Sequence, residues 1–244
     1  MFTRSLTAEL RRRTLLVVST LAVSAALVGF HPAAAQEPLK IGIIGTGRIG
    51  GALARHWVNA GHEVLMSSRH PEQLLDLAKE LGPRAHVGTP QEAASFGSVV
   101  LVSVPYGAMP QIGADFADEL AGKVIIDTSN PVAGRDGVQV PEWQQKGAGI
   151  STAELLKSDR VVRAFNCIPA ASLAGQANRQ PERIAIPIGG DDAAAIAIAE
   201  RLVRDAGFDP VVVGSLAETR RFDLGQPLAK GNLSAAELRA LVGR

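Results

Sequence analysis

The fold is decided by the segment Leu39-Lys40-Ile41-Gly42-Ile43-Ile44-Gly45-Thr46-Gly47-Arg48-Ile49-Gly50. Residues 39–44 form a short apolar run rich in β-branched side chains, which predicts a buried strand. A glycine-rich turn follows at once, and residues 51–60 have a helical pattern that Gly61 ends. A strand, a G-x-G-x-x-G turn and a helix in this order are typical of a turn that binds the diphosphate of a dinucleotide.

Each glycine of this turn has a separate physical role. We expect Gly45 to allow the tight turn, Gly47 to let the backbone approach a pyrophosphate, and Gly50 to let the helix pack close to the strand. The free amides and the dipole at the start of the helix favour an anion. A glycine turn with a purely structural role is the alternative interpretation.

The rest of the chain alternates strands with helices. We expect strands at 63–66, 98–104, 123–127, 160–165, 184–188 and 211–213, and helices at 71–81, 109–120 and 193–206. Capping boxes begin at Thr89, Ser151 and Ser234. The pattern predicts an α/β fold, Rossmann-type and doubly wound, with a mainly parallel sheet and a small C-terminal α/β extension. Ligands of such sheets bind beyond the carboxyl ends of the strands.

Two segments carry more specific expectations. Pro187 interrupts its strand and so predicts an edge position. Residues 131–150 have no clear periodicity and predict a long loop, and loops of this length in compact domains are usually functional.

The first 35 residues have the pattern of an export signal. Three arginines at 11–13 precede a stretch of 16 uncharged residues, and Ala33-Ala34-Ala35 forms a small-residue cleavage site. A membrane anchor is the alternative, although the apolar run is shorter than the roughly 20 residues of a spanning helix. Arg12-Arg13-Thr14-Leu15-Leu16 resembles a twin-arginine signal, and the general secretory route stays open. We therefore expect an exported, periplasmic protein without a stable membrane span, whose dinucleotide-binding domain, with its C-terminal extension, occupies 36–244.

Composition excludes several classes of function. The whole chain carries a formal charge of +1, of which the first 35 residues contribute +3, so the remainder is close to −2. A nucleic-acid surface needs a strongly basic face, and none is indicated. The single cysteine, Cys167, excludes an internal disulfide and a cysteine-rich metal site. We expect no metal, and we expect Cys167 to be a buried structural residue.

The end of the second strand indicates which dinucleotide binds. Sites for NAD usually place Asp or Glu there, whereas this chain has Ser67-Ser68-Arg69. Two hydroxyls can donate to a 2′-phosphate, and Arg69 can clamp it or stack on the adenine. Arg48 adds positive charge in the glycine turn. The sequence therefore favours NADP. The alternative interpretation is that Arg69 is an ordinary solvent-exposed arginine of a loop.

Two further loops leave the carboxyl ends of apolar strands. They are Val104-Pro105-Tyr106 and Asp127-Thr128-Ser129-Asn130-Pro131, and they are expected to face the nicotinamide half of the cofactor. Ordinary turn chemistry is the alternative, since both loops contain turn dipeptides. Tyr106, the one tyrosine of the chain, is expected on this cofactor-facing loop, and a substrate-side contact is an alternative role for it.

These motifs together resemble those of the coenzyme F420-dependent NADP oxidoreductases, and the reductase domains of six-transmembrane metalloreductases are similar. The residues that carry the resemblance lie at 41–50, 67–69, 104–106, 127–131 and 161–166. The resemblance implies that Thr46 to Ile49 line the diphosphate, that Ser68 and Arg69 hold the 2′-phosphate, and that backbone near Val104 and Ala164 contacts the cofactor. It also implies an acceptor stacked beside the turn at 166–169, and a homodimer.

The predicted function is hydride transfer between NADPH and a flavin, a deazaflavin (coenzyme F420) or another small redox acceptor. Such a transfer depends on positioning, so no catalytic residue is assigned, and His56 and His62 are expected to be surface or packing residues. The predicted cofactor-binding set is Gly45, Thr46, Gly47, Arg48, Ile49, Gly50, Ser67, Ser68, Arg69, Val104, Pro105, Tyr106, Asn130, Pro131, Ala164 and Asn166.

Two alternative functions stay open. One is an exported NADP-binding or sensing protein without turnover. The other is a short relative of the β-hydroxyacid dehydrogenases, which carry a large helical domain after the first. Only 78 residues follow Asn166 here, and they have strand and helix patterns, which disfavours this second alternative.

Overall fold

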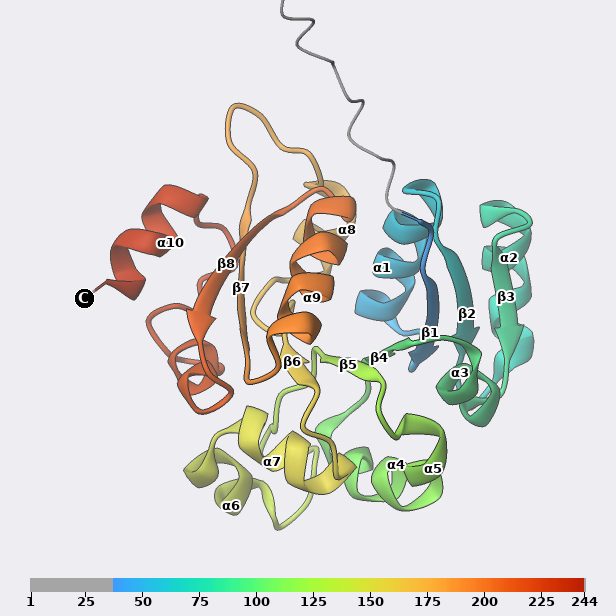
Figure 1. Ribbon diagram of the computed structural model, residues 1–244, viewed down its shortest axis with the longest axis horizontal. Helices are drawn as coiled ribbons and strands as arrows, with labels where there is room; N and C mark the ends of the chain where they lie inside the picture. Colours follow the sequence, from blue (N-terminus) through green and yellow to red (C-terminus); the bar gives the residue numbers. More distant parts are fainter. Residues whose placement is uncertain (1–36, 244) are drawn as a thin grey trace, which may run out of the picture. The chain divides into compact units, whose positions relative to one another are not determined.

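Eight strands form one sheet in the order β3-β2-β1-β4-β5-β6-β7-β8 (Figure 1). The computed structural model describes residues 37–243. The strands are β1 (Lys40–Ile44), β2 (Glu63–Ser67), β3 (Ala85–Gly88), β4 (Val99–Val102), β5 (Val124–Asp127), β6 (Val161–Arg163), β7 (Ala185–Gly190) and β8 (Asp209–Gly214). Neighbouring strands run parallel except β6 and β7, which are antiparallel. The predicted mainly parallel α/β sheet is confirmed.

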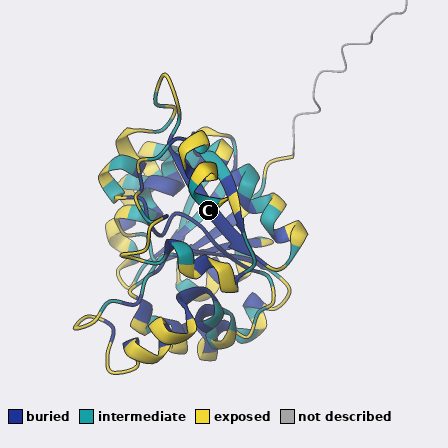
Figure 2. Ribbon diagram, turned by 90° about the vertical axis from the view of Figure 1, so that its left-hand side faces the viewer, coloured by how far each residue is buried: buried dark blue, intermediate teal, exposed yellow. Residues whose placement is uncertain are grey.

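Helices cover both faces of the sheet, as a doubly wound fold requires. The α-helices are α1 (Arg48–Asn59), α2 (Leu75–Leu81), α3 (Pro90–Phe96), α4 (Met109–Asp115), α5 (Ala117–Leu120), α6 (Val140–Lys146), α7 (Ala148–Leu156), α8 (Ala170–Gly175), α9 (Ala193–Asp205) and α10 (Ala235–Val242). One buried cluster joins α1, α8 and α9 to one face, and a second joins α3, α4, α6 and α7 to the other. Figure 2 shows the buried strands between helices whose outer sides are exposed.

Alternating side chains of the strands serve these two clusters. Ile41 and Ile43 of β1 point into the first cluster, whereas Ile44 points into the second. In β4, Val99 and Leu101 belong to the first cluster, and the intervening valines belong to the second. Because both faces are covered, these strands are continuous apolar runs in the sequence.

The strand order reverses between β1 and β4. From β1 the chain adds β2 and then β3 on one side, and it returns to the other side of β1 with β4. The loops after β1 and β4 therefore diverge at the carboxyl edge and leave a crevice, which is where α/β sheets bind ligands.

The C-terminal extension forms a small core of its own. A 3₁₀ segment, η3 (Ala217–Phe222), and α10 follow β8, and Phe222, Leu228 and Leu238 pack with Val211 and Val213 of β8. The capping boxes at Thr89 and Ser234 are confirmed. Among residues 37–243, no helix combines the length and the apolar composition needed to cross a membrane. The predicted export signal lies outside the described residues.

The prediction of an edge position for Pro187 is wrong, because β7 pairs with both β6 and β8. The strand tolerates proline since β6 pairs only with Gly189 and Gly190, so Pro187 lies beyond the end of β6 and needs no amide on that side.

One strand was missed, and two other local predictions are wrong. Strand β3 was not predicted, because its four residues, at 85–88, are all only half-buried and lack an apolar run. Ser151 is inside α7 and does not cap it; its hydroxyl donates to the Trp143 carbonyl oxygen at 3.4 Å. The supposed loop at 131–150 contains α6 and the start of α7.

Candidate active site

The glycine turn after β1 has the close contacts that its sequence predicts. Gly45 has φ +96°, and a Cβ there would lie 2.4 Å from the Ser103 carbonyl oxygen. A Cβ on Gly50 would lie 2.4 Å from the Gly45 carbonyl oxygen, so the turn and the helix need both glycines. Gly47 differs, because a Cβ there would meet nothing within 4 Å. The space beside Gly47 is open, as expected where a ligand approaches the backbone.

The start of α1 is free to bind an anion. Gly47 is its N-cap, no side chain caps the helix, and no acidic residue lies in its first turn. The first amides of a helix that no side chain caps are available to water or to a ligand, and the helix dipole there favours a negatively charged one. Arg48 is exposed beside it and has no ion pair within the described part of the chain.

A cavity of about 310 Å³ occupies the crevice between the carboxyl ends of β1 and β4. It runs from the glycine turn to the loops after β4, β5 and β6. Its lining consists of backbone, hydroxyl, amide and apolar groups with two arginines. The lining residues are Gly47, Arg48, Ile49, Ser103, Val104, Pro105, Thr128, Ser129, Asn130, Val132, Arg135, Phe165, Asn166, Ile168 and Leu224.

At the end of β2, the prediction that the Ser67 hydroxyl binds the cofactor is wrong. The Ser67 hydroxyl is fully buried and donates to the Ile43 carbonyl oxygen at 2.7 Å. The Ser67 carbonyl in turn accepts from the amides of Gly45 and Thr46, so Ser67 shapes the turn. Ser68 is half-buried and its oxygen accepts from the His70 amide, which leaves its hydroxyl proton free to donate. Arg69 is exposed and has no ion pair within residues 37–243.

The prediction that the Tyr106 side chain contacts the cofactor is also wrong. Its side chain is fully buried in the second cluster, on the other side of the loop from the cavity. The hydroxyl donates to the Ala148 carbonyl oxygen at 2.7 Å and lies 3.0 Å from Thr152 Oγ1. Burial raises the pKa of this phenol well above its ordinary value, with a further contribution from Asp127. Tyr106 therefore anchors the loop after β4.

A buried ion network supports the loops after β5 and β6. Arg163, fully buried at the end of β6, donates through Nη1 to Asp127 Oδ2 and to the Ser129 carbonyl oxygen, both at 2.7 Å. Its Nη2 donates to Asp223 at 3.0 Å and to Asn130 Oδ1 at 3.2 Å. Burial disfavours the charge on Arg163, but the two carboxylates outweigh it and raise the pKa of this arginine. The guanidinium thus fixes three loops that surround the cavity.

Two asparagines face the cavity in a fixed orientation. Asn130 donates to the Asn166 carbonyl oxygen at 2.7 Å, and Asn166 donates to the Phe222 carbonyl oxygen at 2.9 Å. Asn166 is only 6% exposed, and its Oδ1 has no hydrogen-bond partner among the described residues. A buried amide oxygen without a donor is costly, which suits a site where a ligand supplies the donor. Phe165, next to it, has φ +60°, a strained conformation for a bulky residue.

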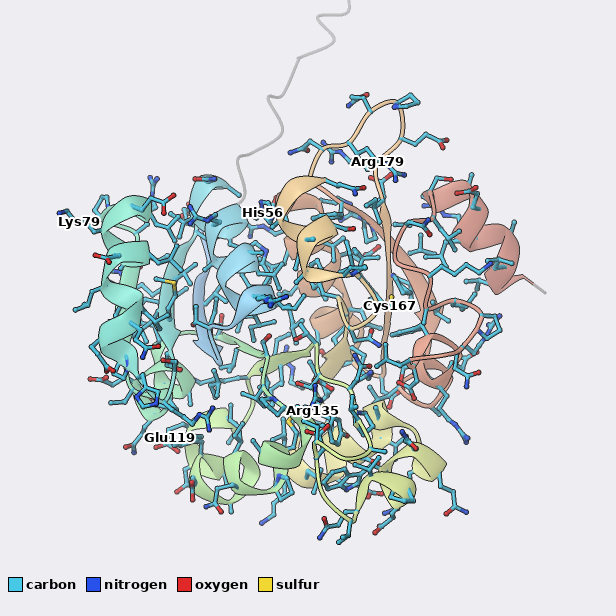
Figure 3. The ribbon with its side chains drawn as sticks, turned by 180° about the vertical axis from the view of Figure 1, so that it is seen from behind. His56, Lys79, Glu119, Arg135, Cys167 and Arg179 are labelled. Carbon is cyan, nitrogen blue, oxygen red and sulfur yellow. The ribbon has the colours of Figure 1, made fainter. Side chains whose placement is uncertain are left out.

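Arg135 is tied to the same end of the cavity (Figure 3). Its Nη2 donates to the Asn130 carbonyl oxygen and to Asp136, each at 2.7 Å. Asp136 also accepts from the Val132 amide, so the segment after β5 is held in a compact turn.

Cys167, labelled in Figure 3, is buried, and burial raises the pKa of its thiol to about 12, in accord with the predicted structural role.

The structure brings together seven of the predicted residues at the cavity: Gly47, Arg48, Ile49, Val104, Pro105, Asn130 and Asn166. Ala164 is buried behind the lining, and its amide donates to the Asp127 carbonyl oxygen. Pro131 does not line this cavity either, but lines a neighbouring one.

Sequence reasoning missed Arg163, Asp223, Arg135 and Leu224. Arg163 had a readable signal, since a charge inside the apolar run 161–165 must have a partner. Asp223 had none, because 60 residues separate it from Arg163. Within residues 37–243, no group of three or more His, Cys, Asp or Glu side chains is arranged to hold a metal ion.

The fold and this crevice define an α/β dinucleotide-binding protein. The family model described as "NADP oxidoreductase coenzyme F420-dependent" matches residues 40–131. The rat metalloreductase STEAP3 is 33% identical over 191 residues, which are 77% of this chain and 36% of the relative. The F420-dependent NADP reductase of Methanothermobacter thermautotrophicus is 31% identical over 148 residues, covering 55% of this chain and 64% of that protein.

Solved structures share the fold of this chain. A hypothetical protein from Sinorhizobium meliloti superposes with a TM-score of 0.69 at 26% identity, covering 81% of this chain and 96% of that one. A putative F420-dependent NADP reductase from Arthrobacter shares the fold, with a TM-score of 0.64 at 23% identity, covering 75% of this chain and 87% of that one. In residues 40–131 the chain belongs to the family of NADP oxidoreductases described as coenzyme F420-dependent. It spans about a third of the metalloreductase and just under two thirds of the archaeal reductase.

Proposed function

We propose that this protein transfers a hydride between NADPH and a flavin-like acceptor, a flavin or a deazaflavin. The observation that carries the proposal is the continuous cavity that joins the glycine turn to Asn130 and Asn166. The cavity runs from the glycine turn to the asparagines, so a dinucleotide with its diphosphate at the turn would have its nicotinamide at the asparagine end. The archaeal relative is named an F420-dependent NADP reductase, which supports an acceptor of this class.

The residues present fit NADPH at each part of the molecule. The uncapped start of α1 and the open space beside Gly47 suit the diphosphate. Ser68, Arg69 and Arg48 suit the 2′-phosphate, because all three have free donors and no carboxylate of β2 opposes them. The amide side chains of Asn130 and Asn166, which line the other end of the cavity, suit the polar carboxamide of the nicotinamide.

The chemistry of the step comes from the nicotinamide, which supplies the hydride when bound. The protein's contribution is positioning, and the strained backbone at Phe165 and the fixed amides of Asn130 and Asn166 supply a rigid wall for it. Val104, Ile168 and Leu224 provide apolar surface that limits water around the reacting rings.

Purified protein mixed with NADPH and FMN, FAD or coenzyme F420 tests the proposal. The absorbance of the reduced nicotinamide should fall only when an acceptor is present. Tight binding of NADPH with no acceptor-dependent oxidation would overturn the proposal and support the alternative of an NADP-binding protein without turnover.

We propose in addition that residues 1–35 export the protein to the periplasm and that it forms a homodimer. The basis for export is the arginine-rich start, the apolar run and the alanines at 33–35. Fusion of residues 1–35 to a reporter that works only after folded export separates the twin-arginine route from the general one. Sedimentation tests the dimer, and a monomer at all concentrations would refute it.

A further inference from the structure

A second cavity, of about 400 Å³, lies beside the first. The two cavities share Asn130 and Leu224, so the second one borders the nicotinamide end of the proposed cofactor site. It is remote in sequence from the glycine turn and from the end of β2, which account for the phosphates of NADPH. A chemical group bound in this second cavity would therefore be part of the molecule that contacts the nicotinamide, which is the hydride acceptor.

The lining of the second cavity is cationic. Arg220 and Arg221 of η3 contribute two positive charges, and Gln144 and Gln226 contribute amide donors. The one carboxylate of the lining, Asp223, already accepts from Arg163 at 3.0 Å and from the Ala148 amide at 3.3 Å. Both carboxylate oxygens of Asp223 therefore already accept hydrogen bonds from the protein.

The side chain of Arg220 is positioned by packing of its stem and not by an ion pair of its guanidinium. A Cβ on Gly147 would lie 2.4 Å from Cγ of Arg220 and 2.8 Å from Cδ, so the arginine stem packs against the junction of α6 and α7. Its guanidinium has no ion pair or side-chain hydrogen bond within the described part of the chain. Arg221 differs, because its Nη2 donates to the Val242 carbonyl oxygen at 2.7 Å and to that of Leu241.

Leu224 completes the arrangement. It is 55% exposed although it lies at the boundary of both cavities. An apolar side chain between a nicotinamide site and a cationic pocket suits a molecule with a flat ring at one end and an anion at the other. Two arginines and two amides match the charge and the acceptor oxygens of a phosphate.

We propose that the second cavity binds a phosphate carried by the hydride acceptor, and that Arg220 recognises it. The inference rests on the proposed function, because it takes the acceptor to lie against the nicotinamide. It narrows the substrate class to phosphate-bearing acceptors.

FMN and riboflavin form a matched pair of probes, since they differ only in the phosphate. The full protein, saturated with NADP⁺, is titrated with each flavin while quenching of flavin fluorescence reports binding. The wild type should bind FMN at least about tenfold more tightly than riboflavin, the range of a charge-assisted hydrogen bond. Arg220→Gln should bring the ratio close to one, and Arg220→Lys should retain part of the preference.

Arg84→Gln is the matched control. Arg84 is an exposed arginine in the turn before β3, and it has no ion pair within residues 37–243. The control should keep the wild-type ratio. Equal affinities for the two flavins in the wild type, an unchanged ratio in Arg220→Gln, or no binding of either flavin would overturn the inference.

Oxidation of NADPH by the same two flavins separates this inference from the proposed function. A preference for FMN in binding without any oxidation of NADPH would support the phosphate site and contradict hydride transfer to a flavin, and coenzyme F420 then tests the remaining acceptor of the proposal. Oxidation at equal kcat/KM for both flavins would leave hydride transfer standing and sink the phosphate site.

Discussion

The two ends of the proposed cofactor site differ in how they are built. At the 2′-phosphate end, Ser68 and Arg69 are neighbours in the sequence, and their donors reach solvent without support from the rest of the fold. At the nicotinamide end, Asn130 accepts from Arg163, which also binds Asp127 and Asp223. Asn166 in turn donates to Asn130 Oδ1 and to the Phe222 carbonyl oxygen. The first end is a local motif, whereas the second is a buried network assembled from three distant segments.

This difference predicts different consequences of mutation. A change at the exposed end should alter nucleotide choice and leave stability nearly intact. A change in the buried network should lower stability first, because removal of one charge leaves its partners buried and uncompensated. The four predictions below run from the largest expected effect to the smallest.

Arg163→Met should lower the free energy of unfolding by about 3–5 kcal/mol, because Asp127 and Asp223 lose their cation while Asp127 stays fully buried. Urea denaturation followed by circular dichroism measures this effect. The exposed Arg84→Gln variant is the control and should shift the midpoint little. A loss below about 1 kcal/mol, the range of surface ion pairs, would mean that the network does not hold this end together.

Arg69→Glu should reverse or abolish the preference for NADP⁺ over NAD⁺, with a loss of NADP⁺ affinity of at least about tenfold. The physical reason is repulsion between the new carboxylate and the 2′-phosphate. Isothermal titration with both nucleotides measures the ratio, and Arg84→Glu provides a control with the same change of charge. An unchanged ratio would assign the 2′-phosphate to other residues.

Gly47→Ala should weaken NADPH binding by about tenfold while stability changes by less than about 1 kcal/mol, because the new methyl group fills open space that the diphosphate needs. Gly51→Ala is the control within the same helix; its methyl group makes only ordinary contacts at 3.8 Å and beyond, so binding should persist. Equal NADPH affinities for the two variants would show that Gly47 does not face the cofactor.

His62 gives a reference point remote from both ends. Its Nδ1 accepts from the Leu39 amide at 3.0 Å, and its Nε2 lies 2.9 Å from Asp205 Oδ2. Burial lowers the pKa of His62 below its ordinary value, although Asp205 partly opposes the shift. The unfolded chain therefore binds a proton first, and stability should fall as the pH drops below about 6.5.

His62→Asn, whose side-chain oxygen can accept from the Leu39 amide, should flatten this pH dependence. Unfolding midpoints measured between neutral and mildly acid pH, for the wild type and the variant, check the expectation. Parallel curves would assign the acid sensitivity to other groups.

The glycine turn and the end of β2 could be predicted from the sequence because the patterns that indicate them lie within short segments of the chain. The strand, turn and helix around Gly45 to Gly50 follow from period, glycine spacing and a helix stop within one short segment. The same holds for the two confirmed capping boxes. The direction in which a serine hydroxyl points could not be predicted in this way. Ser67 and Ser68 are adjacent in the sequence, and the pleat of β2 directs the Ser67 side chain into the core.

The packing at the nicotinamide end was predicted only in part, because it depends on long-range contacts. Tyr106 was assigned to the cofactor by its place after β4, yet the 3₁₀ turn at 106–108 directs its ring into the core beneath α7. Asp223 and Leu224 reach the site only because η3 folds back over the end of β7, a long-range packing that no residue pattern encodes.

Stereospecific transfer of deuterium tests the central claim most directly. NADPH labelled at either face of C4 is oxidised by the protein with a flavin or coenzyme F420, and the mass of the NADP⁺ product is measured. A rigid nicotinamide site that passes hydride directly to an acceptor predicts complete loss of the label from one face and complete retention from the other. The same mixture of products from both labels, or no acceptor-dependent oxidation, would contradict the account.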